Sequence, residues 1–214
     1  MKIEIWSDIM CPFCYIGKRN FEKALGLFAE RDKVEVEWKS FQLDPTIPEN
    51  PSVTNAYEYL ALAKGISLAD SKAMHENVIL SAKHVGLTYN YENAIVANSF
   101  NAHRLIQLAK TKSLGDQAEE ALFKAYFTEG KNINDTETLI GIGGNIGLAL
   151  DAVSNMLASN EMASAVNSDI QESREIGVKG VPFFVIDRKY AVSGAQPVEV
   201  FVETLEKAMA QLSR

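Results

Sequence analysis

The chain has 214 residues, enough to bury a sizeable core in one large domain or two small ones. Hydrophobic residues make up 47% and charged residues 23% of it, as in ordinary globular proteins, so the core needs no disulfide staples. The formal net charge of −7 argues against nucleic acids and anionic membranes as partners.

The N-terminus runs directly into a strand pattern, and no long apolar stretch follows it. We therefore expect neither a signal peptide nor a membrane span, and a cytoplasmic location. In a reducing compartment a close pair of cysteines is more often catalytic than structural.

The first thirty residues carry the main motif. The alternating segment 3–6 predicts a short strand, and the helical spacing of Cys14, Phe21, Leu25 and Phe28 predicts an amphipathic helix. Pro12 suits the first turn of that helix, where a missing N–H costs little. Cys11 and Cys14 therefore lie at a strand-to-helix junction, with Cys11 at the helix N-terminus.

This position favours redox chemistry. Unpaired N–H groups and the positive end of the helix dipole stabilise a thiolate there, so Cys11 is the candidate attacking thiol. Cys14, one turn further in, is the candidate resolving thiol that closes an intramolecular disulfide. The alternative, a zinc site, needs about four ligands. The chain offers no other cysteine and only three histidines, so we expect no metal.

The remaining elements follow a clear order. Residues 34–41 alternate as a second strand, and three prolines between 45 and 51 then mark a domain boundary. About a hundred residues of helical pattern follow, including a helix opened by Asn134 with Glu137 as a capping box. The glycine run 141–147 lacks the spacing of a phosphate loop, so it predicts close helix packing. A helix ending at Gly177, a hairpin over 180–193 and a helix from Pro197 complete the chain.

A strand, a CxxC motif and a helix at the N-terminus resemble the thioredoxin superfamily. Two segments narrow this resemblance: Trp6-Ser7-Asp8 and Cys11-Pro12-Phe13-Cys14-Tyr15-Ile16-Gly17-Lys18. Their sequences resemble the DsbA-like branch, and more narrowly FrnE-like proteins. Residues 98–105, 122–130 and 190–196 also resemble FrnE-like signatures. The resemblance implies an α/β thioredoxin fold, β-α-β then α-β-β-α, with a large all-helical domain inserted after the second strand. We place the thioredoxin-like domain at 1–45 plus 160–214 and the helical domain at 46–159.

The resemblance also implies the second half of the site. Val181-Pro182 matches the segment that carries a cis-proline facing the thiols, and Val181 would present a strand edge to an extended substrate peptide. The predicted substrate-binding residues are Pro12, Phe13, Val181, Pro182 and His103. His103 has a structural alternative that we favour, as a hydrogen-bonded histidine of the helical core. The aromatic side chains of Phe123, Tyr126 and Phe127 are also expected in that core.

Two charged residues of the second strand, Glu37 and Lys39, share one face of it. Either is a candidate to relay a proton to Cys14, but a solvated face is the simpler expectation.

We expect a thiol–disulfide oxidoreductase or isomerase acting on protein or peptide disulfides. DsbA-type oxidants carry histidine where this chain has Phe13, so the reduced form should be stabilised less and the couple should be mild. No metal or organic cofactor is required, although glutathione is a candidate redox partner. The alternatives are a glutathione-dependent isomerase or transferase of small molecules, and a chaperone-like binder of unfolded chains. The oligomeric state stays open, a homodimer included.

Overall fold

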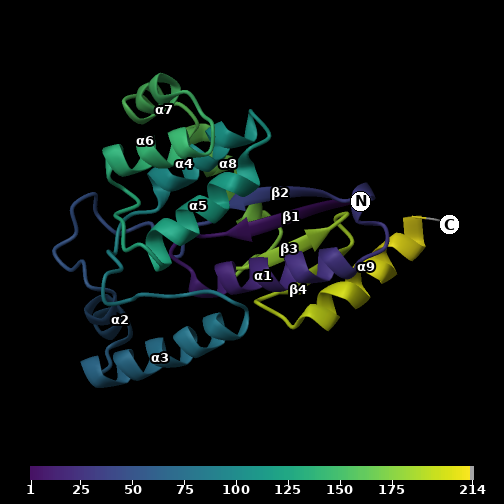
Figure 1. The fold of residues 1–214 in the computed structure, drawn as a ribbon, viewed down its shortest axis with the longest axis horizontal. Coiled ribbons are helices and arrows are strands. Elements are labelled where there is room, and N and C mark those ends of the chain that lie inside the picture. The colour runs from purple at the N-terminus through teal and green to yellow at the C-terminus, as the bar shows by residue number, and fades with distance from the viewer. Residues whose placement is uncertain (213–214) are drawn as a thin grey trace. The chain divides into compact units, whose positions relative to one another are not determined.

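The computed structural model describes residues 1–212, which divide into two compact units (Figure 1). One unit consists of Met1–Leu43 and the chain from Asn167 onward, and the other is Asp44–Val166. The boundaries predicted from the sequence lie after residues 45 and 159, and the division into a thioredoxin-like and a helical domain stays a prediction. Residues 213 and 214, which the predicted thioredoxin-like domain includes, lie outside the described residues.

The first unit holds the described strands. They form one mixed sheet in the order β2-β1-β3-β4, in which β1 pairs parallel with β2 and antiparallel with β3. Its elements are β1 (Lys2–Ser7), α1 (Pro12–Leu27), a short 3-10 helix (Arg31–Lys33), β2 (Glu35–Ser40), the later turns of α8 (Ala163–Glu175), β3 (Phe183–Ile186), β4 (Tyr190–Ser193) and α9 (Val198–Leu212). This is the expected β-α-β and α-β-β-α arrangement, which confirms the predicted fold class.

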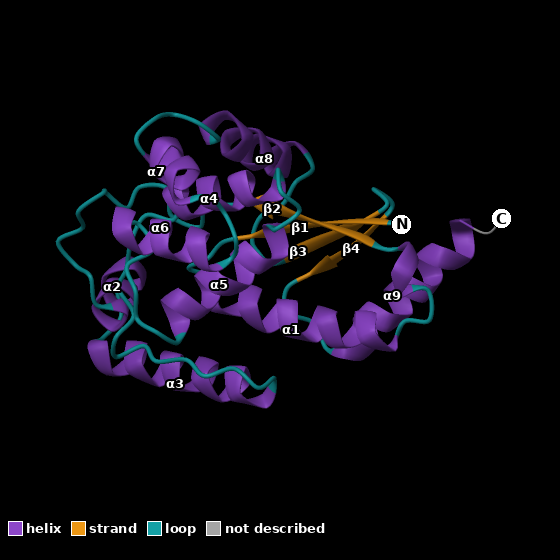
Figure 2. Cartoon of the chain, turned by 45° about the horizontal axis from the view of Figure 1, so that its top comes forward, coloured by secondary structure: helices purple, strands orange, loops and turns teal. Residues whose placement is uncertain are grey.

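One face of the sheet is covered by α1 and α9, which pack side by side (Figure 2). Phe184 of β3 meets Phe21 of α1 with ring centroids 5.5 Å apart, and Phe201 of α9 at 4.7 Å. Side chains alternate along β1, so Ile3 and Ile5 face these helices and are fully buried. Burying each such side chain stabilises the fold by about 1.5–3 kcal/mol, which fixes the helix that carries the cysteines onto the sheet.

The opposite face carries charge, and here the sequence-based expectation was wrong. Lys39 is not solvated: its side chain is 13% exposed, and its amine lies 3.1 Å from Asp169 and 3.2 Å from Glu172, both on α8. Glu37 also pairs with Lys39, at 3.4 Å. The physical reason is that α8 returns over this face, which strand alternation cannot reveal. Because α1 lies on the other face, neither Glu37 nor Lys39 is placed to relay a proton to Cys14.

The second unit is helical. It contains α2 (Ala56–Lys64), α3 (Leu68–His84), α4 (Phe100–Lys110), α5 (Gly115–Phe127), α6 (Thr136–Asn145), α7 (Leu150–Leu157) and the first turn of α8. Phe123, Tyr126 and Phe127 of α5 are at most 3% exposed, so they are core residues as expected.

The helix ends follow from capping side chains. Asn55 begins α2 by accepting the N–H groups of Tyr57 and Glu58. Asp135, not the predicted Asn134, begins α6 by accepting the Thr138 N–H at 2.8 Å. The Asn134 side chain instead accepts a hydrogen bond from Asn101, 3.0 Å away on α4.

The first three glycines of the glycine run lie in α6, and two of them allow close packing, as predicted. A Cβ atom on Gly143 would stand 2.6 Å from the Val153 side chain, and one on Gly144 would stand 2.5 Å from that of Leu150. Both neighbours belong to α7, so the two helices approach at the glycines.

Candidate active site

The turn between β1 and α1 places Cys11 as predicted. Cys11 is the N-cap residue of α1, with extended backbone and Pro12 directly after it. Its N–H donates to the Asp8 carbonyl at 2.9 Å, and its carbonyl accepts the Cys14 N–H at 3.0 Å. Cys11 therefore sits where the positive end of the helix dipole favours a thiolate.

Both cysteines are free thiols and both are buried, Cys11 at 4% and Cys14 at 1% exposure. The Cys11 thiol donates to the Val181 carbonyl at 3.4 Å. It also hydrogen-bonds with Cys14, so the structure brings the two thiols and the Val181-Pro182 segment together.

The Cys14 thiol is held in its protonated form. Burial raises its pKa well above the ordinary value, because a thiolate there would lose its hydration, and the hydrogen bond with Cys11 raises the pKa further. The Asp8 backbone and the Ser7 side chain hydrogen-bond to the sulfur and act in the opposite direction, but burial dominates. A protonated inner thiol suits the resolving role, since it does not compete with Cys11 for the first attack.

The Val181–Pro182 peptide bond is cis, as the resemblance led us to expect. The Pro182 carbonyl accepts the Gly194 N–H at 2.8 Å, which ties the proline to the end of β4. On the other side, a Cβ atom on Gly17 of α1 would stand only 2.9 Å from Pro182 Cγ. Gly17 thus lets the cysteine helix approach the proline.

The other predicted site residues differ in exposure. Phe13, between the two cysteines, is 46% exposed, while Pro12 and Val181 are half-buried. His103 lies in α4 of the helical unit and is only 1% exposed. Its role in substrate binding stays a prediction.

Two residues of the site were not singled out from the sequence. Ser7 ends β1 and reaches Cys14, and the buried Asp8 accepts the Leu43 N–H at 2.7 Å. The available signal was a Ser-Asp pair at the end of a buried strand, directly before the cysteine turn.

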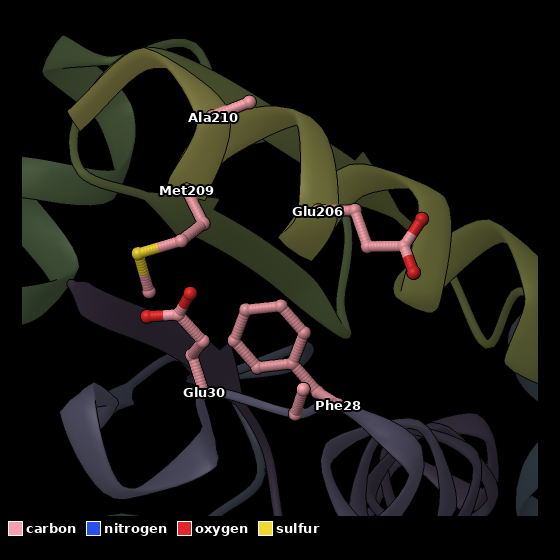
Figure 3. Close-up of a pocket in the computed structure, with 6 residues that line it drawn as sticks. Phe28, Glu30, Glu206, Met209 and Ala210 are labelled. Carbon is pink, nitrogen blue, oxygen red and sulfur yellow. The ribbon is translucent and has the colours of Figure 1, made fainter. Parts of the chain in front are cut away.

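A surface pocket of about 280 Å³ lies at the other end of α1 (Figure 3). It is lined by Phe28, Ala29 and Glu30 on one side and by Glu206, Met209 and Ala210 of α9 on the other. A helix of 16 residues is about 24 Å long, so this pocket is separate from the thiols.

Within residues 1–212, no cluster of three or more His, Cys, Asp and Glu side chains could hold a metal ion. Nor does any helix of that part combine the length and the apolar character needed to cross a membrane.

Residues 2–206 match the DSBA-like thioredoxin domain family. The chain belongs to this family. The DSBA-like structure of the probable DsbA oxidoreductase SCO1869 from Streptomyces coelicolor is 38% identical, with 98% of this chain and 90% of that chain covered and a TM-score of 0.93. Membership supports an oxidoreductase activity in general, and it confirms the family expected from the sequence.

A more distant solved structure shares the fold, and a more distant sequence relative matches most of the chain. The cytosolic disulfide reductase DsbM from Pseudomonas aeruginosa is 13% identical, with 99% of this chain and 100% of that chain covered and a TM-score of 0.69, and a second DsbM structure is with GSH. The uncharacterized protein YwbO of Bacillus subtilis is 24% identical over 206 residues, which cover 95% of this chain and 94% of YwbO.

Proposed function

We propose that this DSBA-like protein exchanges thiols and disulfides with protein or peptide substrates through Cys11 and Cys14. The contact of the Cys11 thiol with the Val181 carbonyl, beside a cis-proline and with Cys14 one turn deeper, carries the proposal. It combines a thiol at a helix N-terminus, a protonated partner thiol and a backbone edge for a peptide.

The reaction takes two steps. The Cys11 thiolate attacks one sulfur of the substrate disulfide; the Cys11–substrate bond forms, and the other substrate sulfur leaves with the electron pair and takes up a proton. Cys14 then loses its proton and attacks the Cys11 sulfur, which releases the second substrate thiol. The substrate gains two electrons and the protein becomes a disulfide, and the reverse sequence oxidises a dithiol.

The substrate would dock at the Val181 edge. A peptide lying along this backbone can add as a strand, since main-chain hydrogen bonds hold it in register. The Val181 carbonyl accepts the Cys11 S–H in the dithiol and becomes available to a peptide N–H once that proton has left. Phe13 and Pro12 offer the apolar surface beside the dithiol that a hydrophobic side chain of the substrate would contact.

Insulin reduction and refolding of scrambled ribonuclease test the proposal. We expect Cys11→Ser to abolish both activities, and Cys14→Ala to accumulate mixed disulfides with its substrates in cells. Equal turnover by wild type and Cys11→Ser would refute the proposal, and the trapped partners would show the direction of electron flow.

A glutathione-dependent reaction is the second candidate. It is favoured by the likeness to DsbM, which has been solved with GSH. Glutathione would serve as a redox partner of the dithiol or as a co-substrate for an electrophile. Retention on immobilised glutathione, with turnover of an electrophile by Cys14→Ser, would support this candidate over protein disulfide exchange.

We further propose that the protein works in the cytoplasm, the location that the name of the cytosolic reductase DsbM gives for that protein.

Chaperone-like binding of unfolded chains would show itself as suppressed aggregation that survives loss of both thiols. Sedimentation would show whether the protein is a homodimer.

A further inference from the structure

We propose that the Ser7 hydroxyl acts in the resolving step, by donating a hydrogen bond to the Cys14 sulfur as it becomes a thiolate. This inference rests on the proposed thiol–disulfide exchange and assigns a residue to its second half.

Ser7 is held by regular structure. It is the last residue of β1 and is fully buried, and its carbonyl accepts the Phe41 N–H at 3.0 Å. Alternation along β1 puts its side chain on the face of Ile3 and Ile5, which α1 covers. The hydroxyl reaches Cys14 from there and hydrogen-bonds to its sulfur. Its position therefore does not depend on the substrate.

The surroundings of Cys14 otherwise disfavour a thiolate. Cys14 is 1% exposed, so water cannot solvate the charge that develops on its sulfur. Hydrogen bonds from the Asp8 backbone and from Ser7 favour that charge. The first is fixed by the main chain, which leaves Ser7 as the contribution that a side chain supplies.

The effect of Ser7 should depend on the state of Cys11. In the dithiol, the hydrogen bond to Cys11 and the charge of its thiolate raise the pKa of Cys14. Once Cys11 is bound in a mixed disulfide it carries no charge, and both of these opposing contributions fall away. Burial still raises the pKa of Cys14, but the hydrogen bonds from Ser7 and Asp8 remain, so a Cys14 thiolate is less disfavoured after Cys11 has reacted than before.

An aromatic disulfide, dithiobis(nitrobenzoate), separates the two steps. Attack by Cys11 releases one thionitrobenzoate and leaves the other bound to Cys11. Cys14 then loses its proton to the buffer and attacks Cys11; the Cys11–Cys14 bond forms, and the second thionitrobenzoate leaves with the electron pair. Stopped-flow absorbance resolves a first phase that depends on reagent concentration and a second that does not.

We expect Ser7→Ala to slow the second phase about tenfold or more, because a hydrogen bond to a charged group contributes about 1.5–3 kcal/mol. The first phase should change less than about twofold, since the helix terminus stabilises the Cys11 thiolate in the variant as in the wild type. The pH profile of the second phase should move to higher pH in Ser7→Ala. Ser7→Thr keeps the hydroxyl and should restore most of the rate.

The matched control is Ser173→Ala. Ser173 is also fully buried, but its hydroxyl donates to the Ile170 carbonyl at 2.6 Å within α8, so both phases should match wild type. Ser7→Gly serves as a second hydroxyl-free variant if Ser7→Ala does not fold.

Three results distinguish the possibilities. An unchanged second phase in both hydroxyl-free variants would overturn the role of Ser7 while leaving the exchange reaction intact. Equal slowing of both phases would show a structural role only, and so would overturn the inference as well. Release of fewer than two thionitrobenzoates per wild-type protein, with no Cys11–Cys14 disulfide formed, would instead refute the proposed exchange function.

Discussion

Gly17 is the residue at which the cysteine helix meets the cis-proline. The space beside its Cα is occupied by Pro182, so a methyl group there would have to displace the proline or the helix. Overpacking of this kind costs about 1–3 kcal/mol, which exceeds the gain of about 1 kcal/mol in helix propensity from alanine.

We expect Gly17→Ala to lower the free energy of unfolding and to slow disulfide exchange, because Pro182 moves away from the thiols. Urea unfolding and insulin turnover measure the two effects. Gly26→Ala is the matched control, since it lies in the same helix and its added methyl meets nothing within 4 Å. It should be slightly more stable and fully active; equal effects at both positions would contradict the steric argument.

His75 makes the helical unit sensitive to acid. It is buried edge-on against the rings of Tyr57 and Tyr91, at 4.8 and 4.4 Å, and its Nδ1 lies 2.8 Å from the Ser71 carbonyl. Burial lowers the pKa of His75 below 6.5, although the hydrogen bond to Ser71 acts the other way. The unfolded chain therefore binds the proton more tightly, and stability falls as the pH drops below about 6.5 toward the folded value.

We predict that His75→Phe, which keeps an aromatic ring, removes part of this loss. Urea midpoints at neutral and mildly acidic pH measure it. His84→Gln is the control, because His84 is exposed on the same helix and should leave the pH dependence unchanged. A His75→Phe protein with the acid sensitivity of wild type would rule out this histidine as the cause.

At the scale of elements, ion pairs join α8 to the sheet. Lys39 of β2 contacts Asp169 and Glu172, and Arg188 in the turn after β3 contacts Glu172 at 2.6 Å and pairs with the buried Glu4. Burial acts to lower the pKa of Lys39, but the charge of Asp169, the hydrogen bond to it, and the contributions of Glu37 and Glu172 together outweigh burial and raise that pKa. The charged Lys39 stabilises the folded protein fully at pH values below its pKa in the unfolded chain, about 10.5. This stabilisation is lost as the pH rises through the pKa of Lys39 in the folded protein.

Replacing Lys39 by Met should destabilise the protein by about 3–5 kcal/mol, because the carboxylates of Asp169 and Glu172 keep their charge and lose the Lys39 cation. The melting temperature should fall accordingly, whereas exchange activity per folded molecule should persist, since α1 lies on the other face. Lys23→Met, at an exposed position of α1, is the control. A small shift equal to that of the control would mean that the remaining ion pairs compensate.

The order and type of the elements could be predicted, because alternation and helical spacing report directly on which face is buried. The exact first residues of the helices could not be predicted. Asp135 caps α6, although Asn134 fitted the capping pattern equally well, and the Asn134 side chain instead accepts a hydrogen bond from Asn101. The environment of Lys39 was missed because it depends on a helix that arrives more than a hundred residues later.

In the candidate site, too, some features could be predicted from the sequence and others could not. Cys11 and Cys14 follow from their spacing at a strand–helix junction, whereas the cis bond at Pro182 could be expected only from family resemblance. The contact of Ser7 with Cys14 was not foreseen, since alternation gives a face but not which side chain reaches a sulfur on the covering helix.

At the scale of the whole molecule, the reduction potential depends on the relative stability of the dithiol and disulfide forms. A strong oxidant of the DsbA type has a stabilised dithiol form and a potential of about −120 mV. Phe13 is 46% exposed, so a substitution at this position does not disturb the core. Its side chain supplies no positive charge beside the Cys11 thiolate. The dithiol form should therefore be stabilised less.

We predict a potential in the range of roughly −180 to −270 mV, and an oxidised form that melts no lower than the reduced one. Equilibration with glutathione buffers and thermal unfolding of both forms measure this. Phe13→His should raise the potential, and Phe13→Leu should leave it unchanged. A wild-type potential near −120 mV would contradict the assignment of a mild couple.

The two points where the helical insertion leaves and rejoins the sheet unit are held together within that unit. The Ser40 N–H, at the end of β2, donates to Asp169 at 3.0 Å, and the Trp6 indole donates to the Asp169 carbonyl at 3.0 Å. The end of β2, where the chain leaves the sheet unit, and α8, where it returns, are thus held next to each other. The entropy cost of closing the loop between them grows only slowly with the number of residues in the insertion. We therefore expect that inserts of very different size, or a short linker, could join these two points while the sheet unit keeps its fold.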